Sequence, residues 1–170
     1  RVCLKIRSST ISFREERTAK VKQTPELDLV QARMQPGILT LKGFLGDDDR
    51  KLVDIIQADQ QSFARLGITA ARIAERLEKL ALLGSDLMEE EVLVEARYRI
   101  KVRDDRGKIP SPWGDGLFEK GDVDLIDNQT GKTLKWNKLT LRLLSAHGFC
   151  GGTGSEYRID PDEAVAILSL

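Results

Sequence analysis

The sequence predicts an α+β fold, with a helical hairpin packed on a small, mainly antiparallel sheet and two short helices toward the C-terminus. Between residues 48 and 84, apolar side chains recur every three or four positions, which is helical spacing. From residue 92 the apolar period changes to two, which is typical of strands. Helices and strands do not alternate regularly along the chain, and this order argues against a doubly wound parallel sheet.

Length and charge limit the classes of protein to consider. The 170 residues suit a single domain, 1–170, with a subdivision into an extended segment (1–46), the helical hairpin (47–90) and the sheet with two helices (91–170). The 27 basic and 27 acidic side chains cancel, which excludes a uniformly basic nucleic-acid binder and an acidic tail protein. The longest apolar run is Ala164 to Leu168, so we expect no membrane-spanning helix.

The N-terminal part gives weaker signals. Only two cysteines, Cys3 and Cys150, occur in a chain of this length, which predicts a reducing, cytoplasmic location. Residues 2–6 alternate apolar and polar side chains, which predicts a strand and not a signal peptide. Residues 14–36 mix charges, threonines and two prolines and are predicted to be mostly irregular, whereas residues 38–42 predict another short strand.

The helical hairpin has recognisable ends. Asp47 is placed to cap the first helix, and Gly67 interrupts it. Thr69 is expected to cap the second helix, and Gly84 to end it. Because the intervening loop is short, we expect the helices to be neighbours, in either an antiparallel hairpin or a sharper corner.

The C-terminal half carries clear turn and cap signals. Residues 108–118 are rich in proline and glycine and predict a loop. A β-hairpin is expected around Gly131, which suits the left-handed position of its turn. Asn137 can cap a following short helix, and Asp160 followed by Pro161 predicts the start of the last helix.

Residues 92–103 give the strongest strand signal, with one apolar face and one basic face. The basic face carries Arg97, Arg99, Lys101 and Arg103. These residues are candidates for contact with nucleic acid or an acidic partner, although RNA-binding sheets add stacking aromatics that this face lacks. The alternative is a solvated face whose charges pair with acids such as Asp122 and Asp124.

A glycine-rich loop at residues 148–155 is the best candidate for a small-ligand site. It adjoins the single histidine and one of the two cysteines. Backbone N–H groups exposed by glycines can surround an anion, and an imidazolium at a helix end would add positive charge. The candidate ligand-binding residues are His147, Cys150, Gly151, Gly152, Thr153, Gly154 and Ser155.

Two alternative roles for this loop stay open. His147 and Cys150 could form a nucleophilic pair, which would make the protein an enzyme. Alternatively, the histidine caps its helix, the cysteine is buried, and the glycines allow the backbone angles of a tight connection. The loop matches no phosphate-binding fingerprint, and one histidine cannot build a histidine-rich metal site, so the sequence predicts no cofactor and no metal.

The helical pair resembles a helix-turn-helix DNA-binding motif. Gly67 lies at the turn, and Ile73 occupies a position where such motifs keep a branched apolar residue. The resemblance implies that Arg72 and Arg76 project from the second helix and that the following strands form a wing, as in winged-helix proteins. The pattern departs at Phe63, where these motifs usually keep a small residue, and the net acidic charge of the region opposes phosphate contacts.

These observations predict a small intracellular binding or interaction module that is not an enzyme. The first alternative is an enzyme or small-ligand-binding protein that uses residues 148–155 and His147. The second is a DNA-binding regulator that uses residues 48–84. The sequence allows a protein partner or a homo-oligomer, predicts no membrane association and does not favour nucleic acid.

Overall fold

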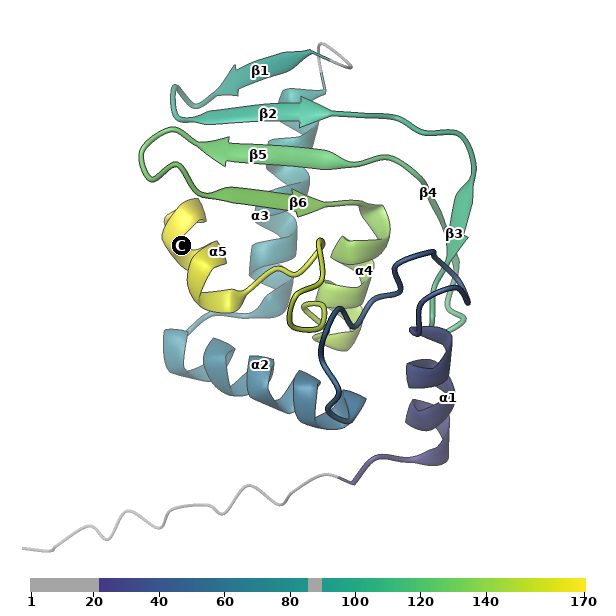
Figure 1. Ribbon diagram of the computed structural model, residues 1–170. Helices are drawn as coiled ribbons and strands as arrows, with labels where there is room; N and C mark the ends of the chain where they lie inside the picture. The colour runs from purple at the N-terminus through teal and green to yellow at the C-terminus, as the bar shows by residue number, and fades with distance from the viewer. Residues whose placement is uncertain (1–21, 86–89) are drawn as a thin grey trace, which may run out of the picture.

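The computed structural model describes residues 22–85 and 90–170 and confirms the α+β class (Figure 1). The helices are α1 (Pro25–Arg33), α2 (Leu52–Leu66), α3 (Ala70–Gly84), α4 (Lys138–His147) and α5 (Pro161–Leu168). The strands are β1 (Glu91–Val94), β2 (Tyr98–Val102), β3 (Lys108–Pro110), β4 (Leu117–Glu119), β5 (Val123–Asp127) and β6 (Thr133–Trp136). One antiparallel sheet has the order β1-β2-β5-β6, and β3 pairs with β4 in a separate two-stranded sheet.

The four-stranded sheet has one buried face and one solvated face. Ile100, Leu125 and Trp136 are fully buried, and Tyr98 is nearly so. These side chains pack with those of α3, which crosses behind the sheet in Figure 1, and they form the first of two core clusters. Residues between them, such as Arg99, point to solvent. This arrangement is usual for antiparallel sheets, which tolerate water on one face.

A second core cluster joins α1, α2 and α4. Leu52 and Ile55 of α2 are fully buried in it, beside Leu139 and Leu143 of α4 and Phe149 just beyond α4. The three- and four-residue spacings place each pair on one face of its helix. The second cluster therefore ties the N-terminal helices to α4.

Most of the predicted helix ends are confirmed. Thr69 caps α3 by accepting a hydrogen bond from a backbone N–H, and Gly67 ends α2 with a φ of 66°. Asn137 caps α4, and Asp160 caps α5 with Pro161 in the first turn. The two helices of the predicted hairpin run in different directions in Figure 1, so they meet at the sharper corner. α3 packs on the sheet, whereas α2 packs on α1 and α5.

The single strand predicted at residues 92–103 is instead two strands joined by a tight turn. β1 and β2 pair antiparallel, and Glu95 and Ala96 between them adopt left-handed φ values of 51° and 53°. The prediction was wrong because apolar and polar residues keep alternating through the turn. Arg97 stabilises the turn, since its guanidinium donates two hydrogen bonds of 2.8 Å to the buried carboxylate of Asp127.

Residues 14–36 were predicted to be mostly irregular, but only residues 22–36 of this stretch are described. This part contains the helix α1, so the prediction was wrong there. Thr24 caps this helix and Pro25 occupies its first turn, which are ordinary helix-start signals. Val30 is the one residue of α1 that is buried, so the helix lacks the apolar stripe on which the prediction relied.

Residues 38–42 form turns and bends, not the predicted strand. The N–H groups of Gly37 and Gly43 both donate to the carbonyl oxygen of Thr40, at 2.8 and 3.3 Å, and this local bonding replaces strand pairing. The strand predicted at residues 2–6 lies outside the described residues.

Two further boundaries differ from the predictions. α2 begins at Leu52, not just after Asp47. Asp48 instead accepts hydrogen bonds from the N–H and the hydroxyl of Thr153, so the acidic run serves a contact between distant loops. The loop predicted at residues 108–118 contains β3 and most of β4, which are too short for their alternation to be recognised in the sequence.

Residues 44–47 and 151–155 pack backbone against backbone, in what we call the loop contact. The Gly152 N–H donates a 3.1 Å hydrogen bond to the carbonyl oxygen of Phe44. A Cβ atom on Gly152 would lie 2.0 Å from the carbonyl oxygen of Leu45, so only glycine fits. The loop contact therefore fastens the C-terminal loop to the N-terminal segment.

Replacing Gly152 with alanine should separate the two loops. The backbone of Gly152 is not left-handed, so the cost arises from the steric clash alone and should reach roughly 3 kcal/mol or more. Gly131 is the matched control, because it has a φ of 70° and open space around it, and its change to alanine should cost about 1–2 kcal/mol. Urea unfolding measures both. A Gly152→Ala protein as stable as Gly131→Ala would contradict the loop contact.

Candidate functional site

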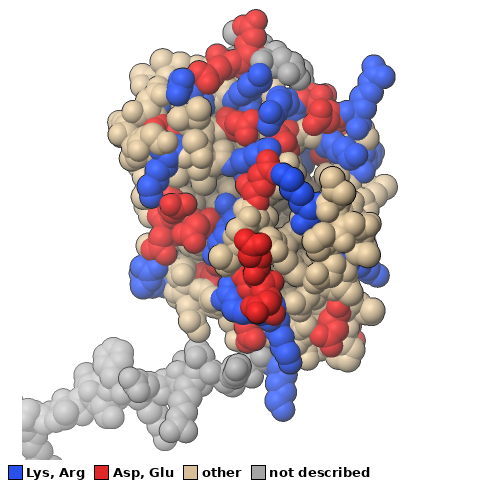
Figure 2. All heavy atoms as spheres, in the orientation of Figure 1, with Lys and Arg blue, Asp and Glu red and all other residues tan. Residues whose placement is uncertain are grey.

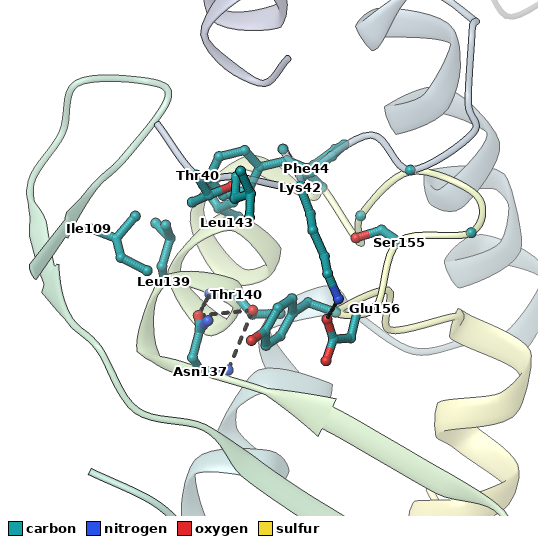
Figure 3. Close-up of a pocket in the computed structure, with 17 residues that line it drawn as sticks. Thr40, Lys42, Phe44, Ile109, Asn137, Leu139, Thr140, Leu143, Ser155 and Glu156 are labelled. Atoms are coloured by element: carbon teal, nitrogen blue, oxygen red, sulfur yellow. Dashed lines mark hydrogen bonds and ion pairs between the residues drawn. The ribbon is translucent and has the colours of Figure 1, made fainter. Parts of the chain in front are cut away.

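An open cleft of about 500 Å³ lies between the N-terminal segment, α4, β3 and the loop that follows α4 (Figure 3). Residues 40–46 form one of its sides and residues 149–157 another, with Ile109 contributed by β3. A volume of about 300–1,000 Å³ is usual for small-molecule sites. The cleft is therefore large enough to hold an organic ligand.

One wall of the cleft is apolar. Leu139 and Leu143 lie four residues apart on α4, so both project from the same helix face into the cleft. Phe44, Phe149 and Ile109 extend this wall. All five side chains belong to the second core cluster or pack against it. The cleft thus opens onto the edge of that core.

The facing wall carries an ion-pair chain of alternating charges. Lys42 Nζ lies 2.9 Å from Glu156 Oε2, and Glu156 also pairs with Lys135. Lys135 Nζ lies 3.3 Å from Asp122 Oδ2, and the Tyr157 hydroxyl donates to the same carboxylate at 2.9 Å. In Figure 3, Lys42 reaches from the N-terminal segment to Glu156 on the opposite loop. The ion-pair chain therefore bridges two sides of the cleft.

These contacts shift the pKa values of Glu156, Tyr157 and Lys135, the last of which rises further above neutral pH. Hydrogen bonds from Lys135 and Lys42 lower the pKa of Glu156 to about 2. Burial and the hydrogen bond to Asp122 raise the pKa of Tyr157 to about 12. At neutral pH Glu156 is therefore an anion, and Tyr157 is a neutral phenol that donates its proton.

The glycine-rich loop contributes to the cleft only in part. Gly151, Gly154 and Ser155 line it, whereas Gly152 and Thr153 face the N-terminal segment in the loop contact. The N–H groups of Gly152, Thr153 and Ser155 all donate to oxygens of the protein itself, at 3.1–3.2 Å. Gly151 and Gly152 allow close packing against the backbones of Arg158 and Leu45, and these three N–H groups are not offered to an anion.

Cys150 lies in the core and not in the cleft. Its side chain is fully buried in the first core cluster, and this burial raises the pKa of the thiol well above its usual range. The nearby Asp59 is also buried and pairs with Arg158 at 2.8 Å. A thiol that stays protonated at neutral pH lacks the nucleophilic thiolate form.

His147 belongs to a clamp on the loop between β3 and β4, and it does not line the cleft. Its ring stacks on Trp113 with centroids 4.2 Å apart, and its Nε2 lies 3.0 Å from Asp115 Oδ2. Arg142 donates to the same oxygen at 2.8 Å. Hydrogen bonds from Ser111, His147 and Arg142 outweigh burial and hold the pKa of Asp115 well below its usual range. This Asp115 clamp fixes the β3–β4 loop to α4.

The basic residues of β2 and its flanking turns lie next to carboxylates. The ion pairs are Arg97–Asp127, Arg99–Glu91 and Arg103–Asp124, with N···O distances of 2.8, 3.3 and 2.6 Å. Lys101 lies opposite Asp124 in the pairing of β2 with β5. Figure 2 shows positive and negative side chains interspersed over the visible face. A phosphate backbone would have to compete with these acids for the three arginines.

The arginines of α3 are paired in the same way. Arg72 Nη1 lies 3.0 Å from Glu75 Oε2, and Arg76 donates to both carboxylate oxygens of Glu95. A groove of about 420 Å³ runs between these side chains and the end of α5. Three of the four cations that line the groove, Arg72, Arg76 and Arg97, pair with carboxylates of the protein, so a phosphate would have to compete with these acids.

The sequence analysis did not identify residues 40–46 or the ion-pair chain as parts of a site. Lys42 and Glu156 lie 114 positions apart, and no local pattern connects them. The available signal was a pair of aromatics, Phe149 within the glycine-rich loop and Tyr157 just beyond it. Aromatic side chains carry large apolar surfaces, so two of them beside a glycine cluster indicate an apolar surface next to that loop.

Two other kinds of site are absent from residues 22–85 and 90–170. This part of the chain holds no group of three or more His, Cys, Asp or Glu side chains placed to bind a metal ion. It also has no helix of the length and hydropathy that crossing a membrane requires.

Replacing Asp115 with asparagine should loosen the clamp in a pH-dependent way. A carboxyl whose pKa is lowered by folding adds stability above its unfolded-state pKa, about 3.9, and loses it as the pH falls below that value. At pH 7 we expect Asp115→Asn to lower the free energy of unfolding by roughly 1–2 kcal/mol. The difference should shrink below about pH 4.

Urea unfolding at several pH values measures this effect. Asp105 is the control, because it lies exposed between β2 and β3 and its change to asparagine should alter stability little at any pH. An Asp115→Asn loss that stays constant down to acid pH would show that the carboxylate charge does not hold the clamp.

Comparisons of the whole chain with known protein families, with curated protein sequences and with solved structures find no match.

Proposed function

We propose that the protein binds a small, largely apolar organic ligand in the cleft and does not transform it. The observation that carries this proposal is the open volume of about 500 Å³ beside the second core cluster. A well-packed core leaves few voids larger than a water molecule. An opening of this size at the edge of a core is the usual form of a ligand site.

The rim of the cleft supports the same proposal. Leu41 lines the cleft and is 87% exposed, and the neighbouring Ile38 is 62% exposed. Burial of one such side chain stabilises a complex by roughly 1.5–3 kcal/mol. A ligand that covers Leu41 would gain this contribution, whereas the protein without ligand leaves it in water.

Binding without catalysis agrees with the groups that face the cleft. Neither Cys150 nor His147 lines it. The carboxylate of Glu156 is neutralised by two lysines, and the Tyr157 hydroxyl donates to Asp122, so both groups have structural partners. The glycine-rich loop takes part through Gly151 and Gly154, as one wall of the site.

Variants that fill the cleft test this function. Ser155 and Thr40 line opposite sides of the cleft in Figure 3, and phenylalanine at either position should occupy part of the volume. Ser145 is the control, because it is exposed on α4 and lies outside the lining. We expect Ser155→Phe and Thr40→Phe each to weaken binding at least about tenfold, and Ser145→Phe to leave it unchanged.

The probe is N-phenyl-1-naphthylamine, an uncharged dye that fluoresces in apolar surroundings. Titration of the wild-type protein should give a saturable rise in fluorescence, and circular dichroism checks that each variant is folded. No saturable signal from the wild type would refute the proposal. An equal loss of binding in Ser145→Phe would also refute it, because the dye would then bind elsewhere.

A further inference from the structure

We infer that the natural ligand of the cleft is a monoanion, an apolar body that ends in a carboxylate, and that Lys42 holds this carboxylate in place of Glu156. The inference rests on the proposed function, since it concerns the polar end of the same ligand. It identifies Lys42 as the residue that selects the charge of the ligand.

The connectivity of the ion-pair chain singles out Lys42. Among the residues that the structure describes, its ammonium has one acceptor, Glu156, at 2.9 Å. Glu156 has two donors, Lys42 and Lys135. If Lys42 pairs with a ligand carboxylate, Glu156 stays paired with Lys135. Asp122 also stays paired with Lys135, so neither carboxylate of the ion-pair chain loses its last cation. Lys42 is therefore the member of the chain that can change partner at least cost.

Exposure makes this exchange easy. The side chain of Lys42 is 78% exposed and that of Glu156 is 38% exposed. An ion pair that is so exposed to water contributes little to stability, so breaking it costs little free energy. An ammonium also has three N–H donors, and Lys42 could contact a ligand before it releases Glu156.

The single cation that changes partner limits the ligand to one negative charge. Lys135 pairs with both Glu156 and Asp122, and Arg103 also lies 3.6 Å from Asp122, so both acids keep a cation when Lys42 leaves. Release of Lys42 from Glu156 frees one positive charge, which matches one carboxylate. A cationic ligand would approach Glu156 between two lysine ammonium groups and would be repelled by both.

The position of Lys42 sets the orientation of the ligand. Its side chain spans the cleft toward Glu156 in Figure 3, while Leu139 and Ile109 lie on another side. A ligand with its carboxylate at the Lys42 ammonium can therefore place an apolar chain or ring against the wall of α4 and β3. This geometry fits a medium-chain fatty acid or an aryl carboxylate better than a polar metabolite.

Competition between three ligands of equal chain length tests the inference. Octanoate, octanol and octylamine are each titrated against bound N-phenyl-1-naphthylamine at neutral pH, and their displacement of the dye gives their affinities. The proteins compared are the wild type, Lys42→Met and Lys79→Met. Lys79 is the matched control, because it is exposed on α3 and does not line the cleft. We expect wild type and Lys79→Met to bind octanoate about fivefold more tightly than octanol. Lys42→Met should lose this preference and keep its affinity for octanol.

A second variant gives an independent readout. Glu156→Gln removes the anion that competes for Lys42, so its affinity for octanoate should rise while that for octanol stays the same. Circular dichroism and dye binding show whether each variant is folded.

The outcomes distinguish the two proposals. If none of the three ligands displaces the dye and the dye itself does not bind, the proposed function fails. If octanol and octanoate bind equally to the wild type, the cleft binds apolar ligands but Lys42 does not select their charge. A preference for octylamine would also overturn the inference, because Glu156 would then be the anchor.

Discussion

The close approach of two backbones at the loop contact sets the geometry of the side of the molecule that carries the cleft. A Cβ atom on Gly46 would lie 2.4 Å from the backbone nitrogen of Ser155, and Gly152 allows even less room beside Leu45. Asp47 N–H donates to the Thr153 carbonyl at 2.8 Å across the same contact. Glycine at residues 46 and 152 is therefore a steric requirement. Because the contact is made by backbone atoms, the spacing between these two sides of the cleft does not depend on side-chain rotamers.

The remaining sides differ in how firmly they are held. α4 contributes Leu139 and Leu143 from within a packed core, where movement would open voids. β3 belongs to a separate two-stranded sheet, which is held by the Asp115 clamp and by the packing of Ile109 and Phe118 against the second core cluster. The ion pair between Lys42 and Glu156 is open to water, with the Lys42 side chain 78% exposed. The cleft thus combines an apolar surface that is fixed by core packing with an exposed ion pair that breaks at low cost in free energy.

Local signals predicted the fold well where one residue type meets one backbone requirement. Thr69, Asn137 and Asp160 were recognised as caps, because a side-chain oxygen next to free N–H groups is a short-range arrangement. The turn at Glu95 and Ala96 was missed, because neither residue usually adopts left-handed angles and Arg97 secures the turn through Asp127, thirty positions away. α1 was missed because it buries only Val30.

The cleft was predictable only at its glycine-rich side. The density of glycines pointed to a loop that lines the cleft in part, but Gly152 within this loop meets the backbone of Leu45 and does not line the cleft. His147 and Cys150 were grouped with this loop because they are neighbours in sequence, whereas α4 turns one toward the Asp115 clamp and the chain buries the other. Lys42 meets Glu156 only in the folded chain, 114 positions away, so the place of Lys42 in the cleft could not be predicted from the sequence.

The separation of the two sides of the cleft in sequence has a kinetic consequence. Asp48 and Thr153 meet across 105 positions, and Lys42 and Glu156 across 114. Contacts that close so long a loop carry a large entropic cost and tend to form after local helices and hairpins. During synthesis the cleft has no second side until the last part of the described chain has left the ribosome. A ligand bound in the cleft would then stabilise only chains in which both sides have folded, and its concentration in the cell would influence how many of them survive proteolysis.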